Sequence, residues 1–163
     1  MIDRRVKTPC VGICSTGFGD DVCRGCKRFV HEVIDWNHYS DTQKNLVWQR
    51  LEHLLQQVME HSVDFHDVSL FEEQIKSLGV LYPQHFNQHA KAFFFLKAIH
   101  KQLDHADQLI DFGISIKASL NHLPLTDLYN QLAEQYWELS KAYYEATAAR
   151  SFSIEPEVAV EDS

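Results

Sequence analysis

Four cysteines are the residues of this sequence best suited to chemistry, and all of them lie near its start. They follow the pattern Cys10-x3-Cys14-x8-Cys23-x2-Cys26, and no cysteine follows them. Two close pairs separated by a short loop can converge on one tetrahedral site, where thiolates suit Zn²⁺ or an iron–sulfur cluster. We find no secretory signal, and clustered cysteines in a reducing compartment are typical of metal ligands, so we predict one metal centre.

The residues around the cysteines fit such a centre. Gly25 permits a tight turn within the Cys23–Cys26 pair that directs backbone amides at the sulfur atoms. Four thiolates leave two net negative charges on Zn²⁺ or on an oxidised four-iron cluster, so charge does not choose the metal. Spacing alone favours zinc. The excess negative charge can be offset by three neighbouring cations, Arg24, Lys27 and Arg28.

The segments that carry and follow the cysteines resemble a bacterial domain-of-unknown-function family of short four-cysteine proteins, described as predicted iron–sulfur proteins (YdhL-like). The similarity covers about residues 8–52 and rests on PCVGIC at 9–14, CRGCKR at 23–28, EVIDW at 32–36, SD at 40–41 and VWQRL at 47–51. The resemblance implies a metal centre, makes iron–sulfur as favoured as zinc, and implies no known activity. The chain after about residue 60 lies outside it.

Basic residues near the cysteines open another interpretation. Residues 1–50 hold eight Lys and Arg against six acids, which is +2, and the rest of the chain carries −10, giving the net −8. A basic patch with an aromatic residue could bind nucleic-acid phosphates, although compensation of thiolate charge is the favoured explanation. The residues concerned are Arg4, Arg5, Lys7, Arg24, Lys27 and Arg28, with Phe29.

Two aromatic sets also allow more than one interpretation. Trp36 and Trp48 could stack on a base or a peptide, but we expect them to pack the cysteine module against the first helix. Phe93–Phe95 cover a wide arc of an expected helix and are interpreted as core rather than as a partner-binding face.

Histidines form two pairs at helical spacing. His85 and His89 stand four residues apart, as do His100 and Asp104, and such pairs can hold a metal ion on one helix face. No HExxH motif accompanies them, so we interpret the histidines as scattered surface residues.

The elements that must position these residues are expected to be helical, because no segment alternates convincingly between apolar and polar residues. Ser40 and Gln43 form a capping box for a helix to about His61, with its buried stripe at Val47, Leu51, Leu54, Leu55 and Val58. Further helices are expected from Ser69 to a stop at Gly79, over 84–119 with a break near Asp104–Asp107 or Gly113, and after a Thr126 cap.

The sequence therefore predicts a mainly α fold, with an N-terminal four-cysteine metal-binding knuckle module followed by an α-helical bundle. We divide it into residues 1–60 with the module and its anchoring helix, 61–150 with the helical extension, and 151–163 as an acidic disordered tail. We expect a cytoplasmic, non-catalytic interaction protein without membrane segments, which binds protein partners through its helical body. The alternatives are an iron–sulfur electron-transfer protein and a nucleic-acid-binding adaptor.

Overall fold

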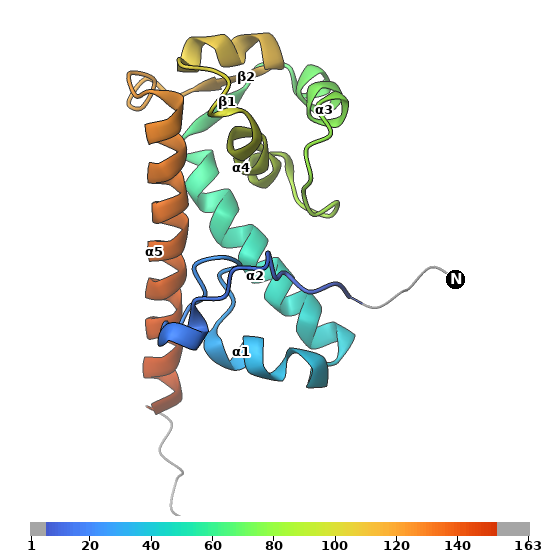
Figure 1. Cartoon of the computed structure of the whole chain (residues 1–163), viewed down its shortest axis with the longest axis vertical. Coiled ribbons are helices and arrows are strands. Elements are labelled where there is room, and N and C mark those ends of the chain that lie inside the picture. Colours follow the sequence, from blue (N-terminus) through green and yellow to red (C-terminus); the bar gives the residue numbers. More distant parts are fainter. Residues whose placement is uncertain (1–5, 153–163) are drawn as a thin grey trace, which may run out of the picture.

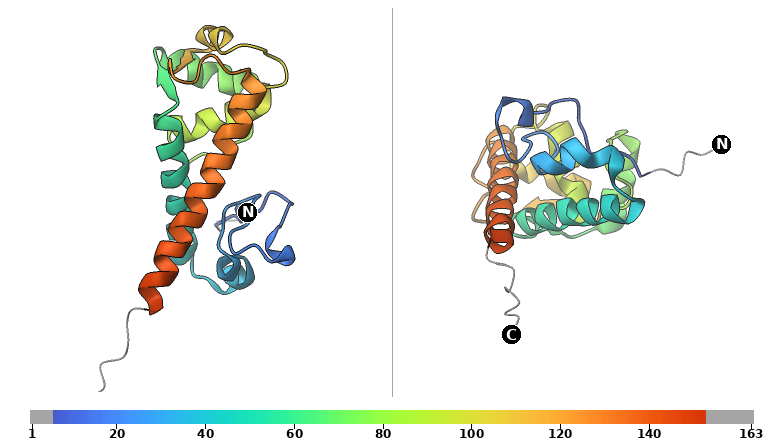
Figure 2. Two further views of the ribbon diagram at one scale, coloured as in Figure 1. Left: turned by 90° about the vertical axis from the view of Figure 1, so that its left-hand side faces the viewer. Right: turned by 90° about the horizontal axis from the view of Figure 1, so that it is seen from below.

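The computed structural model describes residues 6–152, which are mainly helical and include one small sheet. The long helix α5 runs along one edge, with the helical body beside its first half and the cysteine loops beside its second half (Figures 1 and 2). In chain order the elements are η1 (Thr16–Phe18), α1 (Val30–Asp35), η2 (Trp36–His38), α2 (Asp41–Glu60), β1 (Val63–Phe65), α3 (Val68–Ser77), α4 (Gln88–Ile99), η3 (Ala106–Phe112), β2 (Ile114–Ile116) and α5 (Leu125–Phe152).

Helix α2 begins as its sequence predicts. The Ser40 hydroxyl accepts a hydrogen bond from the Gln43 amide at 3.2 Å, and the Gln43 side chain accepts one from the Ser40 amide at 2.9 Å. Two first-turn donors are thereby satisfied, which stabilises the helix start. The residues of the expected stripe are all buried: Val47, Leu51, Leu54, Leu55 and Val58.

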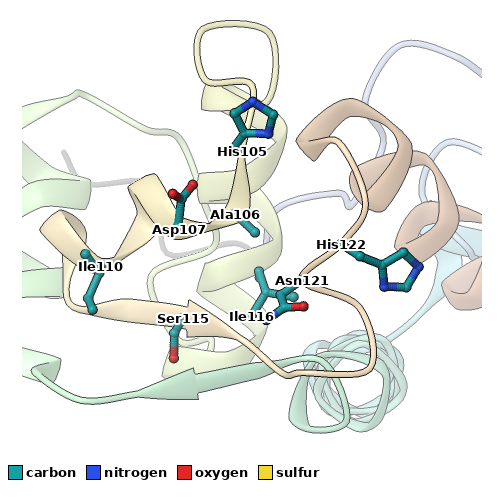
Figure 3. A pocket seen from close by; sticks show the side chains of 8 residues that line it. All are labelled: His105, Ala106, Asp107, Ile110, Ser115, Ile116, Asn121 and His122. Carbon is teal, nitrogen blue, oxygen red and sulfur yellow. The ribbon is translucent and has the colours of Figure 1, made fainter.

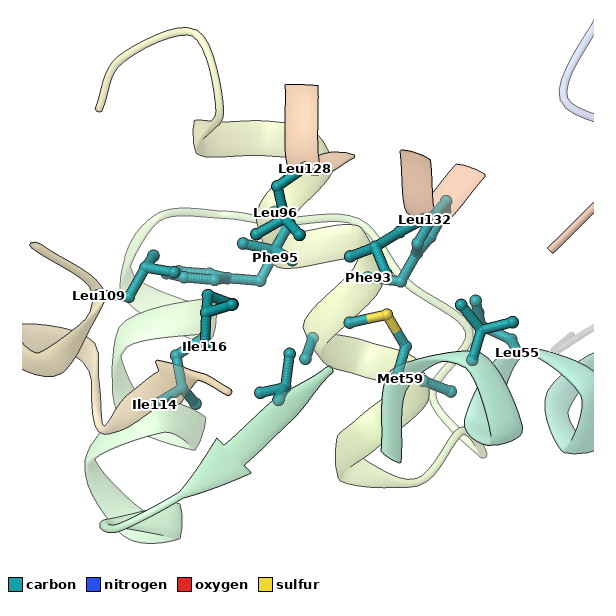
Figure 4. Packing of buried hydrophobic residues seen from close by; sticks show 14 of the residues in the cluster. Leu55, Met59, Phe93, Phe95, Leu96, Leu109, Ile114, Ile116, Leu128 and Leu132 are labelled. Carbon is teal, nitrogen blue, oxygen red and sulfur yellow. The ribbon is translucent and has the colours of Figure 1, made fainter. Parts of the chain in front are cut away.

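The main core forms where α2, α4 and α5 pack against one another and against the small sheet. Figure 4 shows Met59 of α2, Phe95 of α4 and Leu132 of α5 converging in this core. Phe93 and Phe95 are buried and Phe94 is half-buried, which confirms the interpretation of the three phenylalanines as core.

The expectation of one interrupted helix over 84–119 is wrong. Helix α4 ends at Ile99, before the predicted break, and the chain continues through η3 into β2. Strand β2 pairs antiparallel with β1, which the sequence did not predict, because two three-residue strands are too short to show alternation. Gly113 enables this turn, because its φ is +82° and an added Cβ would lie 2.3 Å from the Asp67 carbonyl oxygen.

Two expected helix caps lie at other residues. The cap of α3 is Asp67 rather than Ser69, and the Asp67 side chain accepts a hydrogen bond from the Leu70 amide at 2.9 Å. Thr126 lies inside α5, which begins at Leu125, and its hydroxyl donates to the His100 carbonyl at 3.0 Å. The α3 cap thus lies two residues earlier than expected, and Thr126 bonds to the end of α4 instead of capping a helix.

The N-terminal region contains more helix than predicted. The sequence showed helical signals only from Ser40, whereas α1 and η2 precede that residue. Helix α5 extends through Ser151 and Phe152, where the sequence predicts the start of the tail, and residues 153–163 lie outside the described part of the chain. Within residues 6–152, no helix combines the length and apolar character that a membrane span requires.

Candidate metal centre

The second cysteine pair sits on a short hairpin turn. The Cys23 amide donates to the Arg28 carbonyl at 2.9 Å, and the Lys27 amide donates to the Cys23 carbonyl at 2.8 Å. Val22 and Phe29 form an isolated antiparallel bridge below the turn. Lys27 has a φ of +62°, an unusual conformation for a residue other than glycine. The turn is therefore held in a defined shape immediately after Cys26.

The first cysteine loop lies directly against this turn. A Cβ added to Gly25 would lie 2.3 Å from the carbonyl oxygen of Ile13, so only glycine allows the two loops to approach so closely. The Cys23 thiol donates to the same carbonyl at 3.5 Å, and the Arg24 amide donates to the Ser15 hydroxyl at 2.8 Å. The sequence predicts Gly25 for a tight turn within the Cys23–Cys26 pair, and its close approach to Ile13 is a further role that the sequence does not predict.

The two thiols of the second pair differ in their acidity. Burial raises the pKa of Cys23, but backbone amides of Cys26, Ser15 and Gly25 donate to its sulfur and bring the pKa down to about 7. Burial raises the pKa of Cys26, against an opposing hydrogen bond from Arg28. Hydrogen bonds to a charged sulfur favour the thiolate, which is the form that binds metals.

Two of the three cations beside these thiols are buried. Lys27 is 9% exposed and Arg28 is 4% exposed. Lys27 Nζ donates to the Arg24 carbonyl at 2.6 Å, and Arg28 Nε donates to Cys26 Sγ at 3.3 Å. Within residues 6–152, neither cation forms an ion pair with a carboxylate. Burial lowers the pKa of Lys27 to about 8, while the nearby Cys26 and Cys23 thiolates oppose that shift.

The first cysteine pair faces solvent. Cys10 and Cys14 are exposed, whereas Cys23 and Cys26 are buried. The Gly12 amide donates to Cys10 Sγ at 3.4 Å. Across the described residues, no three His, Cys, Asp or Glu side chains are gathered as metal ligands would be. The structure thus brings the two cysteine loops into contact without gathering the four sulfur atoms round one point.

The residues present nevertheless fit a thiolate centre. All four donors are soft sulfur ligands on two loops that touch each other. The buried guanidinium and ammonium groups need a negative charge nearby, since burying an unpaired cation costs several kcal/mol. The sulfur atoms are the groups placed to supply it.

A buried ion pair, which the sequence analysis did not identify, joins the module to α2. Glu32 in α1 accepts hydrogen bonds from the Phe29 amide at 2.9 Å and from Arg50 Nη2 in α2 at 2.7 Å. The Arg50 guanidinium also lies 3.8 Å from the centre of the Phe29 ring. Both residues lie in the EVIDW and VWQRL segments, but their separation in sequence gave no signal that they pair.

The docking seam, which we define as Val22, Phe29, Trp137 and Tyr144, joins the module to the middle of α5. Trp137 Nε1 donates to the Val22 carbonyl at 3.3 Å, and the Phe29 and Tyr144 rings meet edge to face at 5.0 Å. The Arg24 guanidinium lies 3.4 Å from the centre of the Trp137 ring. The sequence analysis did not identify Trp137 as important, because the position of a tryptophan in an amphipathic helix does not indicate which residues it contacts.

The other candidate aromatic residues also occupy packed positions. Trp36 is buried with Val47 and Leu51, and the Arg28 guanidinium lies 4.9 Å from its ring centre. Trp48 Nε1 donates to the Lys7 carbonyl at 3.0 Å, so the indole fastens the N-terminal segment to α2. These positions favour the packing interpretation of both tryptophans.

The basic residues near the cysteines do not form one continuous surface patch. Lys27 and Arg28 point inward, and the Arg24 guanidinium covers Trp137 and lies 3.7 Å from a Glu134 carboxylate oxygen. Lys7 belongs to the described part of the chain, whereas Arg4 and Arg5 lie outside it. The cations closest to the cysteines therefore contact the protein itself.

The histidine pairs are separated by the structure. His85 lies in the loop before α4 against the Trp48 ring, while His89 lies in α4 against Phe65. His100 is the residue that follows α4 as its C-cap and stacks on Tyr129, and Asp104 lies four residues further along the chain. The i, i+4 spacing thus places neither pair on one helix face.

A pocket of about 570 Å³ lies far along the chain from the cysteines, beside η3 and β2. Figure 3 shows four polar side chains around this space. They are His105, which precedes η3, Asp107 in η3, Ser115 in β2 and His122 in the loop before α5. These side chains are also not arranged as a metal-ligand group in the described part of the chain. The pocket therefore offers polar side chains from three segments of the chain.

Comparison with known families identifies the cysteine region only. Residues 8–55 match the sequence profile of a family described as "Protein of unknown function (DUF1289)". The match confirms the predicted resemblance to a domain-of-unknown-function family over this segment and extends it three residues further into α2. Comparisons of the chain with curated proteins and with solved structures found no match.

Proposed function

We propose that this chain is a small, non-catalytic metal-binding protein in which Cys10, Cys14, Cys23 and Cys26 hold one metal centre. The centre is Zn²⁺ or an iron–sulfur cluster, and the helical body serves as the docking surface for a protein partner. In the described chain, the arrangement requires the exposed Cys10 and Cys14 side chains to turn toward the buried pair.

One observation carries the proposal, namely that Lys27 and Arg28 are buried beside the second cysteine pair without a carboxylate partner in residues 6–152. Four thiolates on a divalent ion, or on an oxidised four-iron cluster, leave two negative charges. Two buried cations match that charge, so the protein environment is balanced when the centre is loaded.

When bound, zinc would cross-link the two loops, and a cluster would add a one-electron redox couple. The protein's own residues would supply thiolates, amide donors and counter-charges. Gly25 would keep the loops in contact, and the Arg28 side chain would remain on Cys26 Sγ.

The iron–sulfur electron-transfer function is a second candidate, favoured by the exposure of one side of the site. Cys10 and Cys14 are exposed, as are Val11, Ile13 and Phe18 around them. Electron exchange with a partner needs a cluster close to the surface, whereas a purely structural zinc site needs no such edge.

Metal analysis of the full-length chain, purified without oxygen, tests both candidates. One zinc per chain and no colour supports the structural centre, and iron with acid-labile sulfide and a brown colour supports the cluster. The same analysis on a Cys26→Ser variant should show loss of the metal, whereas Ser77→Ala, an exposed site on α3, should retain it. A chain that binds neither zinc nor iron, and a Cys26→Ser variant with unchanged metal content, are the results that overturn the proposal.

A further inference from the structure

A second pocket lies beside the docking seam, between the loop that precedes Cys23 and α5. Its volume is about 250 Å³. Pockets that hold drug-sized molecules measure about 300–1,000 Å³, so this one has the size for a single side chain rather than for a cofactor. We define the seam pocket by the six lining residues that could bind a ligand: Asp20, Asp21, Trp137, Lys141, Tyr144 and Glu145.

The seam pocket is acidic. The carboxylates of Asp20, Asp21 and Glu145 line it against the single ammonium of Lys141, which leaves two net negative charges. Asp20 has a partner, because its Oδ2 lies 4.0 Å from Nε of Arg24. Within residues 6–152, Asp21 and Glu145 form no ion pair. Two carboxylates beside the pocket are therefore left without a counter-charge.

Aromatic rings of α5 line the same pocket. The Trp137 ring already attracts cations of the protein itself, since the Lys141 ammonium lies 3.7 Å and the Arg24 guanidinium 3.4 Å from its centre. The electron-rich face of a tryptophan ring favours such contacts. Of these two cations, Lys141 is the one that lines the pocket, so an ammonium is the group that the pocket already accepts.

Lys141 occupies the place on the ring that an incoming ammonium would take, but it is held there weakly. Its side chain is 32% exposed, and its Nζ pairs at 2.8 Å with Oε1 of Glu138, which is 56% exposed. Exposed ion pairs of this kind contribute little to stability. The Lys141 side chain can therefore leave the Trp137 ring to another cation at small cost.

We propose that the seam pocket binds the ammonium group of a lysine side chain on a partner protein, through the Trp137 ring and the carboxylates of Asp21 and Glu145. This inference rests on the part of the proposed function in which the chain docks a protein partner, and it places that contact on α5. The charge of the pocket requires a cation, its ring favours an ammonium, and its volume admits one side chain.

Titration of the full-length chain with a lysine peptide, followed by NMR at the indole N–H of Trp137, tests the proposal. The probe is a pentapeptide, blocked at both ends, with one lysine between glycines, and the same peptide with norleucine at that position is the neutral control. The Trp137 signal is identified by its loss in Trp137→Phe. At low salt, we expect a saturable shift and an affinity for the lysine peptide about tenfold above that for the norleucine peptide. An absent shift, or equal affinity for the two peptides, overturns the inference.

Charge variants test the acidic side of the pocket. An Asp21→Asn/Glu145→Gln double variant should bind the lysine peptide about fivefold more weakly, because each partly exposed carboxylate adds a modest attraction. Its matched control is Glu73→Gln/Asp111→Asn, which removes two exposed acids from α3 and η3 and should bind like the wild type. Equal affinities of the double variant and this control contradict the inference.

A variant of Lys141 tests its competition for the ring. Lys141→Gln should bind the lysine peptide about twofold more tightly than Lys76→Gln, which removes an exposed charge from α3. Binding no tighter than in Lys76→Gln counts against the inference. The metal content of the same samples reports separately on the four-cysteine centre. Metal without peptide binding overturns this inference alone, whereas peptide binding without metal overturns the proposed metal centre and leaves the seam pocket intact.

Discussion

The helical body and the cysteine module are stabilised in different ways. The body buries large apolar side chains of α2, α3, α4 and α5 in one continuous cluster, in which Phe71 and Phe95 are fully inaccessible. The module has only small apolar clusters around Phe29 and Trp36, and its interior holds Lys27, Arg28 and Glu32. The body can therefore fold by apolar burial, whereas the module depends more on the matching of its buried charges.

Under the proposed function, this difference confines the dependence on metal to the cysteine module. Burial of a large side chain contributes about 2–3 kcal/mol, and the body gains this many times over. The buried charges of the module contribute little by themselves and become strongly unfavourable when one partner is removed. A substitution in one region should therefore affect that region more than the other.

The largest effect is expected from Cys23→Ser. Structural thiolate sites contribute on the order of 10 kcal/mol when loaded, so loss of one buried ligand should release the metal and unfold the module. Hydrogen exchange should become fast throughout residues 8–35 and remain slow in α4. Retained metal together with a protected module would show that the two regions do not differ as described.

Phe95→Ala should have the opposite regional effect. Removing a fully buried phenylalanine from the body should lower its free energy of unfolding by about 4 kcal/mol, measured by chemical denaturation. The metal content per chain should stay the same under native conditions. Phe18→Ala is the matched control, because Phe18 is 94% exposed and its removal should change stability by less than about 0.5 kcal/mol.

Glu32→Gln should weaken the anchoring of the module on α2. The substitution leaves the Arg50 guanidinium without its carboxylate in a mostly buried position, at a cost of about 3 kcal/mol. Exchange of the α1 amides should accelerate, while the body is little changed. Glu138→Gln, which breaks an exposed pair with Lys141, serves as the comparison and should have almost no effect. Equal effects of the two substitutions would refute the importance of the buried pair.

The smallest effect is expected at the docking seam. Trp137→Phe retains an aromatic ring but loses the hydrogen bond to the Val22 carbonyl, at a cost of about 1 kcal/mol. Exchange should rise in residues 134–145 and around Val22, with metal content unchanged. Arg24→Gln should cost still less, because its side chain is half-exposed where it covers the same ring. A loss of metal in Trp137→Phe would instead place this tryptophan in the support of the ligands.

The sequence was most informative where one residue determines a local structure. The Ser40–Gln43 capping box and the stripe from Val47 to Val58 predicted α2 almost to the residue. The predicted turn at Gly25, which aims a backbone amide at a cysteine sulfur, agrees with the hydrogen bond from the Gly25 amide to Cys23. These features depend on neighbours in sequence, so they can be recognised without a structure.

The sequence was least informative where the structure depends on distant partners. Helix α4 ends at Ile99 because the following segment turns back to pair β2 with β1, a contact between residues about fifty positions apart. Glu32 with Arg50, and Val22 with Trp137, are likewise joined only by tertiary packing. The burial of Lys27 and Arg28 was also missed, since basic residues near cysteines are equally compatible with a solvated surface.

The central claim is that four cysteine sulfurs hold one metal, and X-ray absorption at the metal edge tests it most directly. In the anaerobically purified full-length chain, we predict a first shell made only of sulfur, with metal–sulfur distances of about 2.3 Å, four per ion for zinc. An iron–sulfur cluster would give the same shell with a second shell of iron. A first shell of nitrogen and oxygen, or a shell unchanged when Cys10 and Cys14 are replaced by serine, would contradict the claim.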